Sequence, residues 1–336
     1  NGGDGYVAAK HLTRRGVQVT VCPFGYPRGD ASPARMAALA AVRAGAKVGS
    51  FAAVERSDLI IDALFGVGFR GVLPDEAVPW TLVDTPVLAV DVPSGLDAAT
   101  GLVLEAGFFA DVTVTFQAAK TGHVLGEGPE RSGELIVFDI GLGDPRPELM
   151  LCEAEDAPTP VRTRHAHKWS VGSVAVVGGS PGITGAPLLT ARSALAAGAG
   201  AATVICPGAL QMVYASMDPG VMSRGIGAGT HFGPSDAAEV LDALDRYDVL
   251  ALGPGLGSVE RGFVESLLER WPGTIVLDAD GLNALDGPAD LRRDGATIIT
   301  PHTGEFARLT GGEATYLEAA SLGIEHGVVV LLKGNP

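Results

Sequence analysis

Short runs of consecutive apolar residues recur along the first half of the chain and alternate with segments of helical spacing. Continuous runs rich in Val, Ile and Leu are typical of strands buried on both faces, as in parallel sheets covered by helices. The elements predicted here are helices over Tyr6–Arg15 and Pro33–Ala44 and strands over Val17–Cys22, Leu59–Leu64, Val87–Val92, Val112–Phe116 and Leu135–Ile140. The pattern therefore predicts an α/β domain with a largely parallel sheet.

The pattern stops at Gly143 and restarts after Pro160, and the residues between them are rich in proline and acidic side chains. We interpret residues 146–164 as a linker between a first domain, residues 1–145, and a second domain, residues 165–336. The elements predicted in the second domain are a helix over Ala186–Ala199 and strands over Ser173–Val177, Thr203–Cys206, Val249–Leu252, Thr274–Leu277, Thr297–Thr300 and Val328–Leu332. This half is a second α/β domain and not a copy of the first.

The chain of 336 residues carries 24 Lys and Arg against 39 Asp and Glu, a formal net charge of −15. Such a charge repels nucleic acid and anionic membranes, and no Lys/Arg-rich segment offsets it. No apolar run approaches the ~20 residues of a membrane-spanning helix. The widely spaced Cys22, Cys152 and Cys206 form no CxxC pair and are typical of reduced core residues. We therefore expect a cytoplasmic protein with no nucleic-acid or membrane partner.

Glycine-rich motifs with acidic residues adjoin predicted elements of the first domain. They are NGGDG at 1–5, DALFGVGFRG at 62–71 and AVDVPSGLDAATG at 89–101. Backbone amides around Gly66, Gly68 and Gly71 can hold a diphosphate, and open α/β sheets bind ligands at the carboxyl ends of their strands. Each motif alone also fits an ordinary glycine turn, or an Asp62 or Asp91 that caps a strand end or the following turn.

With TFQAAKTGH at 115–123 and FDIG at 138–141, these motifs resemble the N-terminal domain of the NAD(P)H-hydrate epimerases. The resemblance covers nearly all of residues 1–141 and implies a Rossmann-like three-layer domain that binds hydrated NADH or NADPH and a potassium ion. It places on the ion Asn1, Asp62 and Ser94, whose amide, carboxylate and hydroxyl oxygens are the hard donors that an alkali ion requires. It places on the dinucleotide Gly2, Gly3, Asp4, Asp91, Gly66, Val67, Gly68, Phe69, Arg70, Gly71 and Val72.

Two residues are candidates for the chemistry of this domain. Epimerising the hydrate at its ring carbon requires proton transfer near a nitrogen-stabilised cation. A carboxylate at Asp91 can stabilise that charge or move a proton. Lys120 is the second catalytic candidate, with phosphate binding as its alternative role.

Three successive predicted strands of the second domain end in small, polar, glycine-containing loops. They are GPGLG at 253–257, DADGLNAL at 278–285 and TPHTGEFARLTG at 300–311, and GGSPGITGA at 178–186 follows an earlier strand. The repetition predicts a ligand site at this edge of the sheet. His302 can instead be a structural histidine bonded to backbone, and Glu305 a first-turn helix residue. Lys333 can meet a phosphate or stand solvated at the surface.

With LLKGNP at 331–336, these loops resemble the ribokinase-like superfamily and, within it, the ADP- or ATP-dependent NAD(P)H-hydrate dehydratases. The resemblance covers residues 172–336 and implies ADP or ATP as co-substrate, with magnesium; we expect ADP. It places on the hydrate Ala186, Gly255, Gly257 and His302, and on the nucleotide Lys333, Gly334, Asn335 and Pro336. The superfamily's GxGD motif with its catalytic Asp is expected after Lys333 and does not occur by Pro336, so we expect a sequence truncated at both ends.

The two resemblances together imply the repair of damaged nicotinamide cofactors. The first domain is expected to epimerise the R and S hydrates of NADH and NADPH, and the second to dehydrate the S hydrate at the expense of ADP or ATP. One alternative is a ribokinase-like small-molecule kinase fused to a Rossmann-like domain, against which TPHTGEFARL argues. Another is a non-catalytic dinucleotide-binding module, but the intact Asp62, Asp91 and Ser94 favour catalysis. We also expect a homo-oligomer, of a size that the sequence does not specify.

Overall fold

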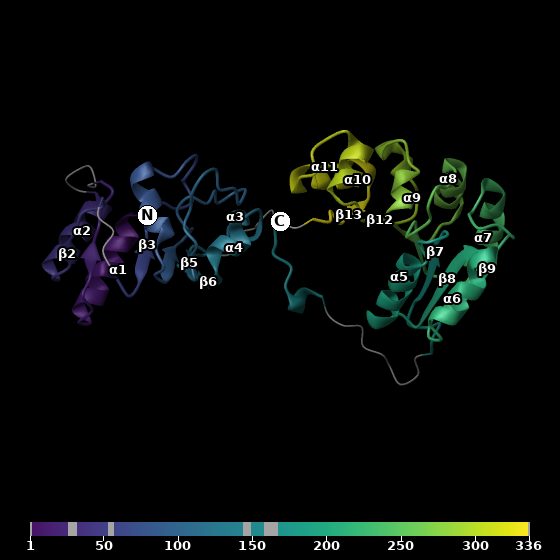
Figure 1. Cartoon of the computed structure of the whole chain (residues 1–336), viewed down its shortest axis with the longest axis horizontal. Coiled ribbons are helices and arrows are strands. Elements are labelled where there is room, and N and C mark those ends of the chain that lie inside the picture. Colours follow the sequence, from purple (N-terminus) through teal and green to yellow (C-terminus); the bar gives the residue numbers. More distant parts are fainter. Residues whose placement is uncertain (1, 26–31, 53–56, 144–148, 158–166, 335–336) are drawn as a thin grey trace. The chain divides into compact units, whose positions relative to one another are not determined.

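The chain forms two compact units, coloured purple to teal and teal to yellow in Figure 1. In this computed structural model, the described residues are 2–25, 32–52, 57–143, 149–157 and 167–334. One unit ends at Leu151, and the other runs from Cys152 to Gly334. The strand pairs within the described ranges are all parallel, which confirms the predicted fold class of two α/β domains.

The first unit begins with two helices and two very short strands. These elements are α1 (Gly2–Arg14), β1 (Thr20–Val21), α2 (Pro33–Arg43) and β2 (Lys47–Val48). Ser32 caps α2, since its hydroxyl accepts the Arg35 N–H at 3.2 Å, and Pro33 occupies the first turn, where a missing N–H costs nothing. The buried Ala9 and Ala41 let α1 and α2 pack closely together.

A four-stranded parallel sheet forms the rest of the first unit. Its strands, in spatial order, are β3 (Ile60–Asp62), β4 (Val87–Val90), β5 (Val112–Phe116) and β6 (Glu134–Phe138). The 3-10 helix η1 (Asp75–Leu82) and the short helices α3 (Thr121–Val124) and α4 (Gly128–Ser132) connect them. Ile60 and Val87 lie in the core of this sheet. Because Asp62 pairs with Ala89 in the register, the polar ends of β3 and β4 lie at the same edge.

The strand predicted over Val17–Cys22 differs most from the structure. Its extended part is Thr20–Val21, which pairs with β2, an unpredicted strand, in a two-stranded sheet separate from the four-stranded one. Val17 and Val48 are both about half exposed, at 47% and 51%. The apolar run therefore lacks the burial on both faces that its composition implied.

The second unit is built on a seven-stranded parallel sheet. Its strands, in spatial order, are β13 (Val329–Val330), β12 (Thr297–Ile299), β11 (Thr274–Leu277), β10 (Val249–Leu252), β7 (Ser173–Val177), β8 (Ala201–Pro207) and β9 (Met222–Ile226). The chain adds β8 and β9 on one side of β7, and then β10 to β13 on the other side. This reversal between β7 and β10 is a topological switch point, where open α/β sheets bind ligands.

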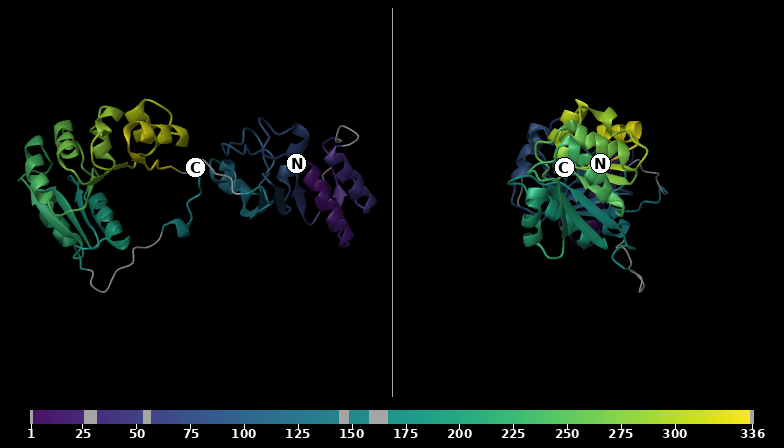
Figure 2. Two further views of the ribbon diagram at one scale, coloured as in Figure 1. Left: turned by 180° about the vertical axis from the view of Figure 1, so that it is seen from behind. Right: turned by 90° about the vertical axis from the view of Figure 1, so that its right-hand side faces the viewer.

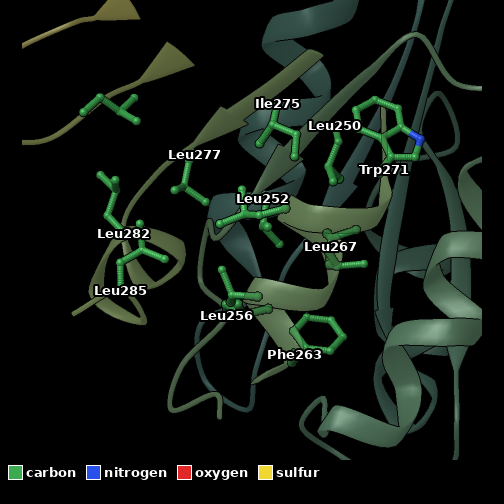
Figure 3. Close-up of a cluster of buried hydrophobic side chains, with 14 of the residues drawn as sticks. Leu250, Leu252, Leu256, Phe263, Leu267, Trp271, Ile275, Leu277, Leu282 and Leu285 are labelled. Atoms are coloured by element: carbon green, nitrogen blue, oxygen red, sulfur yellow. The ribbon is translucent and has the colours of Figure 1, made fainter. Parts of the chain in front are cut away.

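Helices pack on both faces of this sheet, as Figures 1 and 2 show. They are α5 (Gly185–Ala196), α6 (Gln211–Met217), α7 (Ala237–Leu244), α8 (Arg261–Arg270), α9 (Asp280–Asn283), α10 (Thr303–Thr310) and α11 (Tyr316–His326). One core cluster joins Leu188 of α5 and Tyr214 of α6 to Val176 of the sheet. The other joins Phe263 and Leu267 of α8 to the opposite face (Figure 3). Burying each such side chain contributes ~1.5–3 kcal/mol to folding, and the three layers are those expected of a ribokinase-like domain.

The strand predictions succeed where a strand is buried on both faces. The predicted ranges of β7, β10 and β11 match the structure at both ends, and the predicted helix over Ala186–Ala199 is α5. The edge strand β9 was not predicted, because Ser223, Arg224 and Gly225 interrupt its apolar residues and only Ile226 is buried. It therefore lacks the continuous apolar run that predicted the other strands of this sheet.

Among the described residues, no helix is both long and apolar enough to cross a membrane. Cys206 is a buried core residue, as predicted, and burial raises its pKa to about 12. Cys22 is half-buried and Cys152 is exposed, so the prediction of a core residue is wrong for Cys152.

Candidate active sites

A buried carboxylate stands at the end of β3. Asp62 is 3% exposed; its Oδ1 accepts the Ser94 hydroxyl at 2.6 Å, and its Oδ2 accepts the Ser94 N–H at 2.7 Å. The Leu64 N–H adds a third bond at 3.3 Å. Burial raises the pKa of Asp62, and the bonds from Ser94 and Leu64 offset only part of that rise. Within the described ranges no cationic side chain pairs with Asp62, so its ionised form favours an external cation.

Asp91 follows β4 in a left-handed conformation, φ 73°, that non-glycine residues rarely adopt. Its Oδ1 accepts the Thr115 hydroxyl at 3.1 Å and the Phe116 N–H at 3.5 Å, and pairs with Lys120 Nζ at 2.9 Å. Burial raises the pKa of Asp91, but the hydrogen bond and charge of Lys120, with the bonds from Thr115 and Phe116, lower it overall. These bonds reach β5 and the segment after it, and not the turn that follows Asp91.

Lys120 is fully engaged with protein oxygens. Besides Asp91, its ammonium donates to Thr115 Oγ1 at 2.7 Å and to the carbonyls of Phe116 at 2.9 Å and Ala118 at 3.0 Å. An ammonium has three N–H bonds, and four acceptors surround this one. The arrangement favours holding Asp91 ionised over binding a phosphate.

His123 belongs to the same cluster, although the sequence did not single it out. Its side chain is buried, and Nδ1 accepts the Lys120 N–H at 3.1 Å. Burial, followed by the charge of Lys120, lowers the pKa of His123. Both residues lie in TFQAAKTGH, but the burial of the ring beside the ion pair is a result of tertiary packing.

The glycine loop after β3 borders an open hollow. The hollow has a volume of about 450 Å³ and is lined by Leu64, Phe65, Gly66, Gly68, Phe69, Arg70, Val72 and Pro74. The Phe65 N–H donates to Ser94 Oγ at 2.9 Å, which ties the loop to the Asp62 site. The Arg70 guanidinium donates hydrogen bonds to two carbonyls of its own loop, and its Nε lies 3.4 Å from Asp97 Oδ2. The loop thus presents a cation and backbone amides to the hollow, a combination that suits an anionic group.

The NGGDG motif differs from its prediction as a turn that precedes a helix. Asn1 lies outside the described residues, and Gly2–Asp4 form the first turn of α1 itself. A Cβ on Gly5 would lie 2.7 Å from Ala63 Cβ. The glycine therefore lets α1 approach the end of β3, and the helix N-terminus still adjoins the predicted site.

In the second unit, the loops after β7 and β10 pack against each other at the switch point. Ser180 Oγ donates to the Gly255 carbonyl at 3.1 Å. Gly255 has φ 60°, and a Cβ there would lie 2.5 Å from the Ile183 carbonyl, so this position requires glycine. Ala186, half-buried, lies in the first turn of α5, directly after the first of these loops.

Two aspartates after β11 tie in the neighbouring loops. Asp280 Oδ2 accepts the Gly257 N–H at 2.8 Å. Asp278 Oδ1 accepts the Thr300 hydroxyl at 2.7 Å and pairs with Lys333 Nζ at 2.7 Å. The sequence singled out neither aspartate, although both lie in DADGLNAL. The bonds show that the predicted loops do converge at one edge of the sheet.

His302 has the structural role that the sequence left open, and its ring is still largely exposed. Its Nδ1 accepts the N–H groups of Gly304 at 3.0 Å and Glu305 at 3.2 Å, so the ring caps α10. The side chain is nevertheless 60% exposed, and the residue forms a β-bridge with Lys333. The second ring nitrogen is therefore accessible to a ligand.

The residues expected on the nucleotide are only partly described. Lys333 forms the ion pair with Asp278, and Gly334 is exposed. Asn335 and Pro336 lie outside the described residues. In the described part of the chain, no three His, Cys, Asp or Glu side chains converge as a metal cluster.

Comparison with known proteins assigns one family model to each unit. The YjeF-related protein N-terminus matches residues 1–122, and the NAD(P)H-hydrate dehydratase model matches residues 174–336. Along its whole length the chain is 34% identical to the Bifunctional NAD(P)H-hydrate repair enzyme Nnr of Salinibacter ruber, of which it covers 70%. The chain belongs to this family. The enzyme of the same name from Pyrobaculum aerophilum is 35% identical, and the chain covers 71% of it.

The family of bifunctional NAD(P)H-hydrate repair enzymes is thus the one that the motifs resembled, and that prediction is confirmed. Among solved structures, the chain is similar to an ADP/ATP-dependent NAD(P)H-hydrate dehydratase from Bacillus subtilis co-crystallized with ATP/Mg2+. The identity is 26%, the TM-score is 0.43, and the match covers 54% of this chain and 65% of that one.

Proposed function

We propose that the two units act in turn on hydrated nicotinamide dinucleotides in the cytoplasm. The first unit interconverts the R and S hydrates of NADH and NADPH, and the second dehydrates the S hydrate at the expense of ADP or ATP. The observation that carries the proposal is the ionised Asp91, held by Lys120, one strand away from the buried Asp62. Both carboxylates lie at the sheet edge where α/β folds bind ligands.

Asp91 supplies a fixed negative charge to the epimerisation. The reaction passes through a nitrogen-stabilised cation, and a preorganised carboxylate stabilises such a charge without reorganising. Lys120 and Thr115 hold the carboxylate in place through its Oδ1. Among the described residues Oδ2 receives no hydrogen bond, which leaves it for the substrate. Lys120 is then a positioning residue that acts through Asp91.

Asp62 and Ser94, together with Asn1, would hold a potassium ion. The fit rests on the buried Asp62 carboxylate, which the described chain leaves without a cationic partner, and on the adjacent Ser94 oxygen. Such hard oxygens suit an alkali ion. When bound, the ion would supply positive charge to this site.

The dinucleotide lies along Gly2, Gly3 and Asp4 of α1 and the loop from Gly66 to Val72. The hollow beside this loop and the Arg70 guanidinium support a diphosphate there. The N-terminus of α1 adds a partial positive charge.

In the second unit the hydrate contacts Ala186, Gly255, Gly257 and His302, and the nucleotide begins at Lys333 and continues over Gly334, Asn335 and Pro336. ADP or ATP, bound with magnesium, would transfer its terminal phosphoryl group to the hydroxyl oxygen of the hydrate and release AMP or ADP and the hydroxyl proton. Cleavage of the carbon–oxygen bond would then release phosphate. The convergence of these loops at the switch point supports this arrangement. Lys333 pairs with Asp278 in this structure. When the nucleotide binds, its ammonium would instead contact phosphate oxygens.

The decisive experiment follows both hydrates by chromatography with the full-length protein. We expect R and S to equilibrate without nucleotide and the S form to disappear only when ADP or ATP is added. Equilibration at the spontaneous rate would overturn the epimerase assignment. Phosphorylation of vitamin precursors or sugars without loss of hydrate would favour the small-molecule kinase. Dinucleotide binding without turnover would favour the binding module.

A further inference from the structure

We propose that Glu305 and the start of α10 fix His302 as a neutral hydrogen-bond donor, with its proton on Nε2. His302 then holds an acceptor oxygen of the ligand and takes no proton from it. The inference rests on the proposed dehydratase function, in which His302 contacts the hydrate. It adds Glu305 as a positioning residue.

The first step concerns the ring nitrogen that faces the helix. Nδ1 lies 3.0 Å from the Gly304 nitrogen and 3.2 Å from the Glu305 nitrogen, and both N–H groups donate to it. A nitrogen that accepts two N–H groups carries no proton of its own. In the neutral ring the proton therefore sits on Nε2.

The second step concerns the buried carboxylate beneath the ring. Glu305 is 7% exposed, and its Oε2 accepts the His302 N–H at 2.8 Å, which completes a reciprocal capping box. Its Oε1 lies 3.6 Å from His302 Nε2. That separation exceeds hydrogen-bond distance, so the negative charge favours a proton on Nε2 but leaves the N–H free for a ligand.

The third step concerns what this donor can recognise. An N–H on a 60% exposed ring suits a phosphate, carbonyl or hydroxyl oxygen. In the proposed dehydration, the substrate hydroxyl loses its proton as its oxygen bonds to phosphorus. A ring with Nδ1 occupied by two donors and Nε2 already protonated offers no lone pair for that proton. The proton is therefore accepted by a group other than His302.

The tautomer can be measured directly by NMR on the full-length protein labelled with ¹⁵N-histidine. His302→Gln assigns the resonances. We expect an unprotonated Nδ1 and a protonated Nε2 at neutral pH. A proton on Nδ1, or an even mixture of tautomers, would overturn the inference. Because this readout needs no turnover, it still decides the inference if wild-type enzyme fails to dehydrate the hydrate and the proposed function falls.

Two substitutions of His302 separate the helix-capping role of Nδ1 from the donor role of Nε2–H. His302→Asn keeps an acceptor near the Nδ1 position and loses the Nε2 donor, so we expect an unchanged Tm and a KM for the hydrate raised about tenfold. His302→Gln keeps a donor near the Nε2 position and loses the cap, so we expect a lower Tm with a smaller change in KM. The reverse ranking of the two KM values would contradict the donor role.

Glu305→Gln tests the positioning residue, because it keeps the shape and an acceptor for the His302 N–H but removes the charge. We expect a small Nδ1–H population, which cannot accept the Gly304 and Glu305 N–H groups, and therefore a slightly lowered Tm together with a raised KM. Glu325→Gln is the matched control, since Glu325 lies 3.7 Å from His326 Nε2 and is 70% exposed on α11. A wild-type tautomer and KM in Glu305→Gln would remove Glu305 from the proposal.

Discussion

At the scale of single residues, Asp91 carries two local costs. A non-glycine residue in the left-handed region is strained by roughly 1–3 kcal/mol, and a buried carboxylate loses hydration. Lys120 and Thr115 offset the second cost by bonding to the same oxygen. Strain that the surrounding contacts maintain at a strand end is typical of functional positions.

Asp91→Asn should lower epimerase turnover about a hundredfold, since loss of a preorganised charge costs on the order of 3 kcal/mol in barrier. Asn tolerates the left-handed backbone and preserves volume, so Tm should change by only a few degrees. The measurement pairs kcat, from chromatographic resolution of the hydrates, with thermal denaturation. Normal turnover with a much lower Tm would show that Asp91 is structural.

The pH dependence of stability should report on Asp62. Since burial raises the pKa of Asp62, its contribution to stability is present below the unfolded pKa and is lost as pH rises through the folded pKa. At neutral pH, Asp62→Asn should therefore raise Tm in a buffer with only tetramethylammonium as cation. Potassium should raise the Tm of the wild type and leave the variant unaffected. A variant that still responds to potassium would place the ion elsewhere.

At the scale of elements, a close helix–strand contact fixes the position of α1, and an arginine cap stabilises the end of α8. Gly5 of α1 faces Ala63 at the end of β3, so helix and strand meet with no side chain between them. In the second unit, α8 ends at Arg270 without a glycine C-cap. The Arg293 side chain caps the end of this helix instead. It donates to the carbonyls of Leu268, Trp271, Gly273 and Ala296.

Gly5→Ala should destabilise the first unit by ~1–3 kcal/mol, because its methyl group forces α1 away from β3. Urea unfolding followed by circular dichroism measures the change. Gly262→Ala in α8 is the matched control: a Cβ there meets nothing within 4 Å, and alanine should stabilise that helix by ~0.5–1 kcal/mol. Equal effects of the two substitutions would refute the close-approach explanation.

Arg293→Lys should destabilise the second unit by ~2–4 kcal/mol, since an ammonium cannot reach all the carbonyls that the guanidinium fork serves, and partly buried carbonyls lose their partners. Chemical denaturation reports the loss. Arg292→Lys, one residue earlier, should be nearly neutral and serves as its control. If both variants are equally stable, the cap contributes little.

At the scale of the whole molecule, each unit has its own hydrophobic core, with Val87 and Phe108 buried in the first and Leu252 and Phe263 in the second. A domain with its own core can unfold as a cooperative unit. The net charge of −15 is shared by both and favours solubility over association with polyanions.

Calorimetry of the full-length protein should therefore resolve two unfolding transitions. Potassium should raise only the transition of the first unit, and ADP or ATP only that of the second, because a ligand stabilises the unit that binds it. Asp62→Asn should abolish the first response and keep the second. One transition that both ligands shift together would contradict independent sites.

The apolar runs predicted the central strands and the two α/β domains, since such runs are typical of buried strands. The site residues Asp62, Asp91, Ser94 and His302 were implied by the resemblance of their motifs to a known family, and their roles stay a prediction. The strands β1, β2 and β9 were misjudged because they are short or interrupted by polar residues, and few of their residues are buried. NGGDG failed for another reason, since glycine permits a turn and a close helix contact alike.

Only the tertiary structure decided how the site side chains are paired. Asp91 meets Lys120 and Asp278 meets Lys333, partners that lie 29 and 55 residues apart along the chain. The pKa of Asp62 rises and that of Asp91 falls, although each follows a strand in a similar motif. Burial without a cationic partner raises the pKa of Asp62, and the ion pair with Lys120 lowers that of Asp91. Residue type and spacing determine which groups stand at the edge of a sheet, but their charge state depends on neighbours that only folding brings together.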